Sequence, residues 1–488
     1  MLPFLGVGHL RPEKEASAKK KKKKKKMHCE NGPLVLPPPL GRKTSAEHTV
    51  AKSSYNVRRS SVRGWKEHFD KLTLCPRTMA GDPSPPVRYP VFSESGSYVR
   101  VPRSYGRAQF GAPKQDLTDP GARISAQFCG TLLPYQEQAV DRVCEALQAG
   151  GPQEAMLEAG CGCGKTVMSI AVAARMGVRT AVLVHKDFLA QQWKERINTF
   201  LPDATVGVVQ RNRVESDADV VIFMIHSVVS GRYGSDVFAG LGLVVVDEAH
   251  HLCARTFSKS MTLFPGRYRL GLTATPDRRD GLGFALHYFL GPTVFKVTRA
   301  YADVDVRVVR YGAGNHREIF ISGRPAFTQM VTRLVKDAKR TELIVDEIVA
   351  LADAGRRIIV MSDRLHHLDV LMRLVQEQRS LVSCGKYVGE TTKRGKRKRG
   401  KVQEEARVIF STYRMGEEGL DIASLDALVL ATPKRAVEQT VGRIMRAHPD
   451  KKKPLVVDIL DPFSIFWGMH NARRRFYTES GFTMRPAK

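Results

Sequence analysis

A run of small residues just before a lysine is the first place where residue types and spacing suggest chemistry. Within EAGCGCGKTVMSI (158–170), residues 159–166 match the phosphate-loop pattern G-x-x-x-x-G-K-[ST], except that Ala159 takes the first position. Glycines let the backbone curl so that successive N–H groups point at phosphate oxygens. The glycines of this loop are Gly160, Gly162 and Gly164. Lys165 could reach the β- and γ-phosphates, and Thr166 could offer its hydroxyl to Mg²⁺.

The flanking residues favour a nucleotide site over a chance turn. AMLE before the loop is short and apolar, as expected of a buried parallel strand, and VMSIAVAARMG after it has the composition of a buried helix. A helix N-terminus adds a favourable dipole to an anion site. We therefore predict a bound nucleotide with Mg²⁺.

Two adjacent carboxylates follow an apolar segment, LVVVDEAHH, further along the chain. A buried strand that delivers an acid near a phosphate loop is how P-loop enzymes hold Mg²⁺. We expect Asp247 to hold the metal, directly or through water, and Glu248 to orient and deprotonate the attacking water. The alternative is a strand end capped by exposed acids. A zinc site at His250, His251 and Cys253 lacks a fourth ligand and is rejected.

A third group of polar residues recurs at helical spacing. Gln439, Arg443 and Arg446 stand at i, i+4 and i+7, so one face of a helix would present all three. Arginines at such a spacing also occur on ordinary solvated faces.

The elements that must position these residues alternate regularly between strands and helices. Candidate strands of the first half are AMLE, TAVLVH, DVVIFMI, GLVVVDE and YRLGLTA, with helical stretches such as DFLAQQWKERINTF between them. After about residue 300 the alternation resumes as RRIIVMS, LDVLMRLVQEQ, ARVIFST, ALVLATP, AVEQTVGRIMRA and PLVVDIL. This pattern predicts an α/β fold with two tandem domains, each a parallel sheet covered by helices, and a cleft between them for a ligand.

The predicted division of the chain has four parts. Residues 1–79 are expected to be a disordered basic tail, and 80–127 a small N-terminal extension in which YVRVPRSYGRAQFG alternates like a strand. Residues 128–298 would form the first, ATP-binding domain and 299–488 the second. The lysine run at 19–26 is read either as a targeting or nucleic-acid tether or as sequence upstream of a true start at Met27 or Met79.

The charge balance indicates a polyanionic partner, most often nucleic acid. The chain of 488 residues holds 78 Lys and Arg against 49 Asp and Glu, a net charge of +29. Its eight cysteines are scattered without metal-site spacing, which favours free thiols in a reducing, intracellular compartment such as the nucleus or a viral factory. Because no apolar run approaches about 18 residues, we expect no membrane span.

Five short motifs resemble those of the superfamily-two helicases in content and order. They are AGCGCGKT, DEAH, GLTATP (271–276), STYRMGEEGLD (411–421) and QTVGRIMR (439–446). The resemblance covers roughly residues 128–480 and implies two RecA-like domains with ATP between them.

The resemblance also implies roles for single residues. Gln136, in LLPYQEQAV, would recognise adenine, and Gly419 and Asp421 would touch the ribose and sense domain closure. Arg443 and Arg446 would act as arginine fingers on the γ-phosphate. The coupling hydroxyls between the ATP site and the nucleic-acid track would be Thr273 and Thr275.

Within the superfamily, RYRLGLTATPDRRDGLGFALHYFLGP and IIVMSDRLHHLDVL resemble the branch of XPB-type repair and transcription helicases and of poxvirus transcript-release helicases. The leading hypothesis is therefore an ATP-dependent DNA helicase or translocase, with RNA possible as substrate and transcription or repair machinery as partner. The alternatives are a nucleic-acid-binding scaffold without catalysis and the motor subunit of a restriction or repair complex.

A basic stretch, KRGKRKRGK, interrupts the second half between YVGETT and ARVIFST. Its two glycines and self-repelling charges predict an extended loop, which either grips phosphates or is a solvated or targeting segment. The candidate nucleic-acid contacts are Lys393, Arg394, Lys396, Arg397, Lys398, Arg399 and Lys401.

Overall fold

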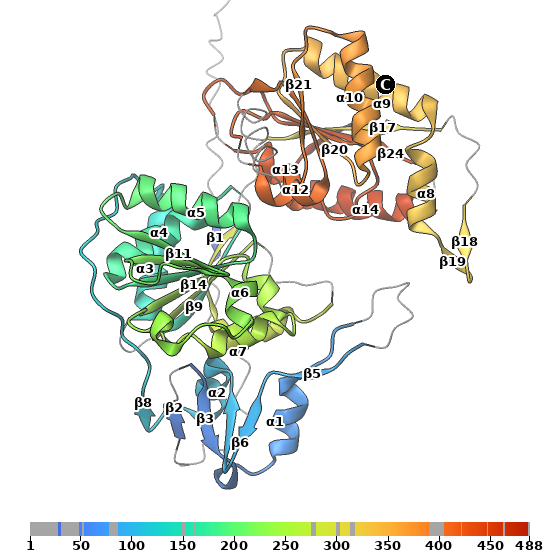
Figure 1. The fold of residues 1–488 in the computed structure, drawn as a ribbon. Helices are drawn as coiled ribbons and strands as arrows, with labels where there is room; N and C mark the ends of the chain where they lie inside the picture. The colour runs from blue at the N-terminus through green and yellow to red at the C-terminus, as the bar shows by residue number, and fades with distance from the viewer. Residues whose placement is uncertain are drawn as a thin grey trace, which may run out of the picture.

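The computed structural model describes most of the chain in separate ranges. These are 28–30, 48–50, 53–77, 86–148, 152–160, 162–274, 280–298, 303–312, 318–389, 405–420, 422–446, 448–461 and 464–486. Three large sheets make up the framework, of nine, seven and five strands (Figure 1).

The nine-stranded sheet contains the predicted phosphate-loop strand and has the order β1-β16-β9-β15-β14-β10-β13-β11-β12. Its neighbours from β16 to β11 are parallel, and the outer strands β1 and β12 are antiparallel. The strands are β1 (His28–Glu30), β9 (Glu154–Ala159), β10 (Thr180–Val184), β11 (Val206–Gln210), β12 (Arg213–Val214), β13 (Val220–Met224), β14 (Leu243–Val246), β15 (Tyr268–Thr273) and β16 (Thr293–Thr298). The accompanying helices are α3 (Pro134–Leu147), α4 (Lys165–Met176), α5 (Asp187–Phe200), α6 (Ile225–Val229) and α7 (Leu286–Leu290).

The seven-stranded sheet is parallel throughout, with the order β21-β22-β20-β23-β24-β17-β25. Its strands are β17 (Asp305–Arg310), β20 (Ile358–Met361), β21 (Cys384–Tyr387), β22 (Val408–Ser411), β23 (Ala427–Leu430), β24 (Leu455–Leu460) and β25 (Thr483–Pro486). The helices are α8 (Phe327–Leu334), α9 (Ala338–Asp353), α10 (Leu365–Gln378), α12 (Tyr413–Gly419), α13 (Glu438–Arg443) and α14 (Ser464–Glu479). A short hairpin, β18 (Phe320–Ile321) and β19 (Arg324–Pro325), projects from this domain (Figure 1).

Continuous apolar runs explain why both sheets are parallel and central. All four residues of β14 are at most 1% exposed, and β10, β13, β20 and β23 are buried along their whole length. Strands covered by helices on both faces bury every side chain, so no polar alternation is needed. The prediction of an α/β fold with parallel, helix-covered sheets is confirmed, and each predicted strand of the two domains coincides with an observed one.

The expected disorder of residues 1–79 is wrong for its C-terminal part. Residues 53–77 include β3 (Tyr55–Arg58), α1 (Trp65–Leu72) and β4 (Thr73–Leu74), and Tyr55 and Leu72 are fully buried. Strand β3 belongs to the five-stranded sheet β6-β7-β3-β2-β8 together with β2 (His48–Val50), β6 (Ser93–Ser95), β7 (Tyr98–Val101) and β8 (Gln115–Asp116). Its strand is short, but a distant partner, β7, supplies the pairing that a local reading of the Ser/Arg-rich stretch could not anticipate.

We call residues 48–116 the N-terminal module. Its segment 98–111 is a strand only at β7, because Arg103–Phe110 forms helix α2 instead of continuing the predicted strand. Pro102 precedes the helix and Gly111 ends it at φ 89°, which are typical helix-boundary residues. The remaining pair, β4 with β5 (Tyr89–Pro90), adds a small two-stranded sheet.

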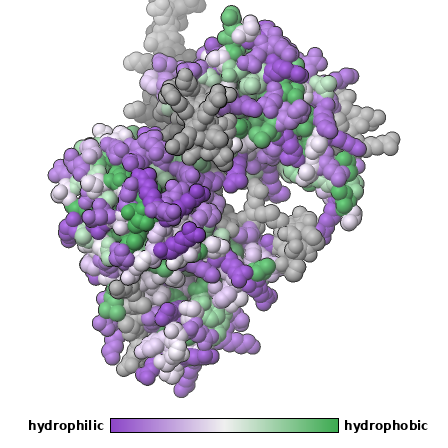
Figure 2. Space-filling model, in the orientation of Figure 1, coloured by the Kyte–Doolittle hydropathy of each residue, from purple (hydrophilic) through white to green (hydrophobic). Residues whose placement is uncertain are grey.

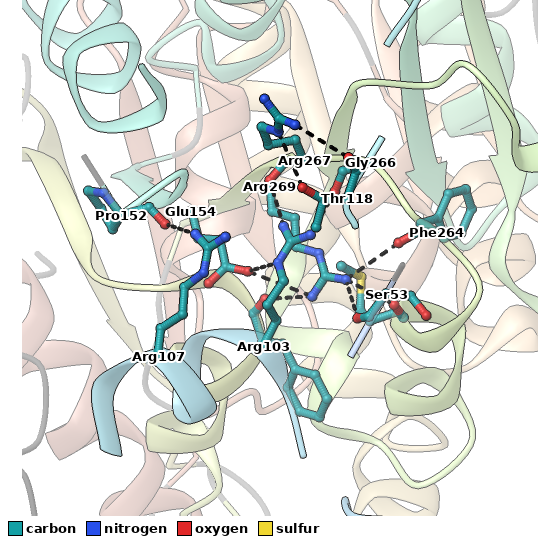
Figure 3. A network of polar contacts seen from close by, with 12 residues as sticks. Ser53, Arg103, Arg107, Thr118, Pro152, Glu154, Phe264, Gly266, Arg267 and Arg269 are labelled. Carbon is teal, nitrogen blue, oxygen red and sulfur yellow. Dashed lines mark hydrogen bonds and ion pairs between the residues drawn. The ribbon is translucent and has the colours of Figure 1, made fainter. Parts of the chain in front are cut away.

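Buried arginines fasten the N-terminal module to the nine-stranded sheet (Figure 3). Arg103 of α2 is fully buried, and its Nε donates to Glu154 Oε1 at 2.5 Å while Nη1 and Nη2 donate to the carbonyls of Gly266 and Arg267. Arg269 Nη2 donates to Ser53 O at 2.7 Å from the other direction. Glu154 begins β9 and Arg269 lies in β15, so the network holds the two strands that lead to the phosphate loop and to Thr273.

On the face shown in Figure 2, apolar residues are scattered in small patches among hydrophilic ones. Among the described residues, no helix has the length and apolar character needed to cross a bilayer.

Candidate active site

The phosphate loop joins β9 to α4, as the strand–loop–helix pattern predicts. Gly162 and Gly164 adopt φ values of 77° and 81°, in the left-handed region that side chains disfavour. A Cβ on Gly164 would also lie 2.4 Å from Gln136 Nε2, whereas one on Gly160 would meet only Cys163 Sγ at 3.8 Å. Two of the three loop glycines therefore have a steric reason, and the loop ends at the N-terminus of a twelve-residue helix.

Lys165 is the first residue of α4, and its Nζ donates to the carbonyl of Ala159 at 2.8 Å. This bond holds the ammonium over the loop that would surround a phosphate. Thr166 follows it, and both residues line a cavity of about 360 Å³. Cys161, between them and β9, lies outside the described residues.

Gln136 lies behind the phosphate loop. Its Oε1 accepts from Leu133 N at 2.9 Å, and its Nε2 donates to Cys163 O at 3.1 Å, so its amide ties the start of α3 to the loop. Tyr135 reinforces the same carbonyl at 3.0 Å. Gln136 does not line the 360 Å³ cavity. Its adenine contact remains a prediction that requires the amide to exchange partners.

The two predicted acids stand at the end of β14, within the same cavity. Asp247 is buried, and it accepts from Trp193 Nε1 of α5 at 2.8 Å and from Glu248 N at 2.9 Å. Glu248 has φ 46°, a conformation that costs a non-glycine residue energy and that persists mainly where the surroundings enforce it, as at active sites. Its carboxylate is 3.3 Å from His250 Nδ1.

Electrostatics separate the two carboxyls. Burial, and then the charge of Glu248, raises the pKa of Asp247. Burial alone would also raise the pKa of Glu248, but the hydrogen bond with His250 and the charge of Lys165 outweigh it and lower that pKa. Glu248 is therefore ionised, as a group that accepts a proton from water must be.

The wall opposite the acids comes from the second domain. Gln439, Arg443 and Arg446 all line the cavity, together with Ala423. The single helical face predicted for them is wrong for Arg446, because α13 ends at Arg443. Beyond Gly442 the backbone tightens into i→i+3 hydrogen bonds, from Ile444 N to Val441 O and from Met445 N to Gly442 O. Arg446 therefore reaches the cavity from a turn.

Arg443 is held by the helix that precedes it in the fold. Its Nη1 donates to Leu420 O at 2.9 Å, and its Nη2 donates to the carbonyl of Glu417 in α12. Thr440 adds a hydrogen bond to the Glu417 carboxylate at 3.0 Å. The end of α12, where Gly419 lies, and α13 are thus one connected unit.

Other predicted site residues are placed or lie outside the description. Thr273 is fully buried as the last residue of β15. Asp421, Thr275 and the basic stretch 393–401 lie outside the described residues.

Several cavity residues escaped the sequence prediction. Helix α5 contributes Leu189, Gln192, Trp193 and Arg196, and His185 and Lys186 precede it. The signal was present as a helical i, i+3, i+4, i+7 stripe in the unit that follows β10, but nothing in the sequence shows which neighbour that stripe faces. His185 is buried beside His251, with ring centres 4.2 Å apart.

The oxygen donors at this site suit Mg²⁺. The hydroxyl of Thr166 and the carboxylates of Asp247 and Glu248 line one cavity, and Mg²⁺ binds through one or two carboxylates plus substrate phosphates. Among the described residues, no cluster of three or more His, Cys, Asp or Glu is arranged to hold a metal alone. When bound with a nucleotide, the ion would neutralise phosphate charge, held by Asp247 and Thr166.

Comparison with known proteins identifies the family. Residues 130–278 match the family described as "Type III restriction enzyme, res subunit". A protein of Acanthamoeba polyphaga mimivirus, named "Putative ATP-dependent RNA helicase", is 31% identical over 385 residues, covering 76% of this chain and 73% of that protein. A protein of African swine fever virus with the same designation is 25% identical over 459 residues, covering 84% of this chain and 86% of its own length.

Among solved structures, S. cerevisiae Dbp5 bound to RNA and ADP BeF3 shares the fold, with a TM-score of 0.52 and 14% identity, over 72% of this chain and 89% of that one. The viral relatives agree with the expected resemblance to enzymes of large DNA viruses, while the XPB-type branch remains a prediction. With its motifs in order on two RecA-like sheets, the chain belongs to the superfamily-two helicases, a family of ATP-dependent motor enzymes.

Proposed function

We propose that this protein is an ATP-driven translocase or helicase that moves on DNA, with RNA as the alternative track. One observation carries the proposal. A single cavity is lined on one side by Lys165, Asp247 and Glu248 of the first domain and on the other by Arg443 and Arg446 of the second. A nucleotide there would be complete only when both domains contribute, which links its hydrolysis to their relative movement.

The chain's own residues divide the chemistry. Lys165 would bind the terminal phosphates, and Glu248 would accept the proton of the attacking water. Arg446, and Arg443 beside it, would stabilise charge that develops on the transferred phosphoryl group. Loss of the γ-phosphate would remove the anion that both domains share, so they would separate. Thr273, with Thr275, would relay this change to the track.

Two cations meet across the domains near this cavity. Lys186 follows β10, and Arg414 belongs to α12. Burial, and then the charge of Arg414, lowers the pKa of Lys186 to about 8. Like charges repel unless an anion lies nearby, so this pair supports a polyanionic track. Contacts to phosphates carry little sequence information, and we expect slight base specificity.

The decisive experiment measures the ATPase rate with single-stranded DNA, duplex DNA, RNA and no nucleic acid. Glu248→Gln serves as the control for contaminating ATPases. The proposal predicts the strongest stimulation by DNA. Stronger stimulation by RNA would move the substrate to RNA, in line with the names of the two viral relatives. Absence of hydrolysis under every condition would leave only a binding scaffold.

A motor subunit of a restriction or repair complex is the second candidate. The matched family description, a restriction-enzyme subunit, favours it. Such a motor would move along duplex DNA without separating strands. Displacement of a triplex-forming oligonucleotide, with no unwinding of a forked duplex, would support this candidate over the helicase. Roles in transcript release or repair, and residence in a nucleus or viral factory, belong to the same proposal.

A further inference from the structure

A large groove lies on the second domain, apart from the ATP cavity. Its volume is about 1120 Å³, above the roughly 300–1,000 Å³ typical of small-molecule sites. It forms where β17 extends past its neighbour β25, whose last pairing is Pro486 with Val308. On that side, Val309 and Arg310 have no strand partner among the described residues.

The groove is strongly basic. Four arginines and one glutamate line it, and the lining arginines are Arg307, Arg310, Arg474 and Arg485. Arg307 is paired with Glu347 at 2.9 Å, and Arg485 with Asp305 at 3.2 Å. The exposed guanidinium groups of Arg310 and Arg474 have no acceptor within the described part of the chain. Two positive charges are therefore available to an anion from outside.

Helix α14 gives the groove an aromatic surface. Trp467 is 44% exposed and shares the outer face of the helix with Asn471 and Arg474, at i, i+4 and i+7. The inner face is fixed to β24, because buried Arg473 forms two hydrogen bonds to Asp458, at 2.9 and 2.7 Å, and Tyr477 adds a third. The outer side chains thus stand on a rigid support.

An exposed aromatic ring between unpaired arginines suits a single strand of nucleic acid. Unstacked bases stack on aromatic side chains, and arginine binds the phosphates between them. A duplex hides its bases, and an acidic peptide has no planar group for the ring. We propose that this groove binds single-stranded nucleic acid, with Trp467 against a base and Arg310 and Arg474 on phosphates. The inference rests on the proposed motor function and adds a second grip outside the ATP cleft.

The test uses the fluorescence of Trp467, because the other two tryptophans, Trp65 and Trp193, are only 9% and 2% exposed. The full chain is titrated with a short oligothymidylate without nucleotide, and Trp467→Phe gives the background. We expect quenching in the wild type that is absent from Trp467→Phe. The phenylalanine variant should bind the strand several-fold more weakly, since stacking is worth about 5- to 150-fold per base.

Arg474→Ser and Arg475→Ser form a matched pair. Both arginines are exposed neighbours on α14, but only Arg474 lines the groove. Arg474→Ser should lower the log–log salt slope of binding by about 0.7, and the double variant with Arg310→Ser by about 1.4. Arg475→Ser should leave the slope unchanged. Equal effects of the two single variants would overturn the proposal, as would quenching by polyglutamate but not by the oligonucleotide.

The ATPase without nucleic acid checks that each variant is folded, and it should be equal in all of them. The outcome is separable from that of the motor proposal. A wild type whose ATPase ignores nucleic acid refutes the motor, whereas retained stimulation without Trp467 quenching refutes only the groove.

Discussion

Replacing Trp193 by Phe tests whether the cavity is built around a metal-holding carboxylate. The indole Nε1 donates to Asp247 Oδ2 at 2.8 Å, and both groups are buried. Phenylalanine keeps most of the ring packing and removes only the donor. Asp247 then keeps the backbone N–H of Glu248 as its remaining described donor.

The expected magnitude follows from that single bond. A hydrogen bond to a charged group contributes about 1.5–3 kcal/mol, and removing a partner that orients a metal ligand costs about 10- to 100-fold in metal affinity. The Trp193 bond also lowers the pKa of Asp247, so its loss adds to the rise that burial causes. We expect the Mg²⁺ concentration for half-maximal ATPase to increase by about 10- to 100-fold.

Trp65→Phe is the matched control. Trp65 is also buried, and its Nε1 donates to Arg59 O at 2.8 Å, but it lies in the N-terminal module. The assay is ATPase rate against Mg²⁺ at saturating ATP, with thermal unfolding measured for both variants. A Mg²⁺ requirement unchanged in Trp193→Phe, or shifted equally in Trp65→Phe, would refute the reasoning.

Three other predictions concern separate parts of the chain. Glu248→Gln should bind ATP yet lose about 10²–10⁴ in turnover, whereas Lys165→Ala should lose nucleotide binding; near-normal turnover of Glu248→Gln counts against its role as base. Replacing the seven Lys and Arg of 393–401 by Ser should flatten the salt dependence of DNA binding by about 2 log units and spare the DNA-free ATPase, and parallel salt plots would assign the stretch elsewhere. Burial, and then the charge of Arg340, lowers the pKa of His367 to about 3, so the folded state loses stability as pH falls below the ordinary value near 6.5. Denaturant unfolding at pH 7 and 4.5 should show a loss of roughly 2–3 kcal/mol that His367→Leu diminishes; an equal loss in that variant would contradict the assignment.

The sequence predicted the parts of the fold that depend on local pattern. Long apolar runs such as LVVV at β14 can only be central strands, and the glycine loop with Lys165 can only follow one of them and begin a helix. Helix α5 was predicted at Asp187–Phe200, where the structure has it. The cavity then brings together both acids and the three residues of the opposite wall, as the motif order implied.

What depended on distant partners was missed. Tyr55 reads as part of a polar tail, yet it is buried because β3 pairs with β7 more than forty residues later. Arg103 reads as a surface charge, and only Glu154 in another sheet explains its burial. Trp193 reads as a core residue, and nothing local reveals that its indole faces Asp247. The early end of α13 reflects a change to i→i+3 bonding that helical periodicity does not encode.

The central claim is that one ATP site is completed by both domains, and Arg446→Ala tests it most directly. Arg446 lines the cavity from the second domain, opposite Lys165 and Glu248. ATP affinity and maximal turnover are measured on the same preparation, with nucleic acid present. We predict affinity within several-fold of the wild type and turnover lower by about 10³ or more, as loss of an arginine finger causes. Unchanged turnover, with weaker nucleic-acid binding alone, would contradict the account and make Arg446 a contact to the track.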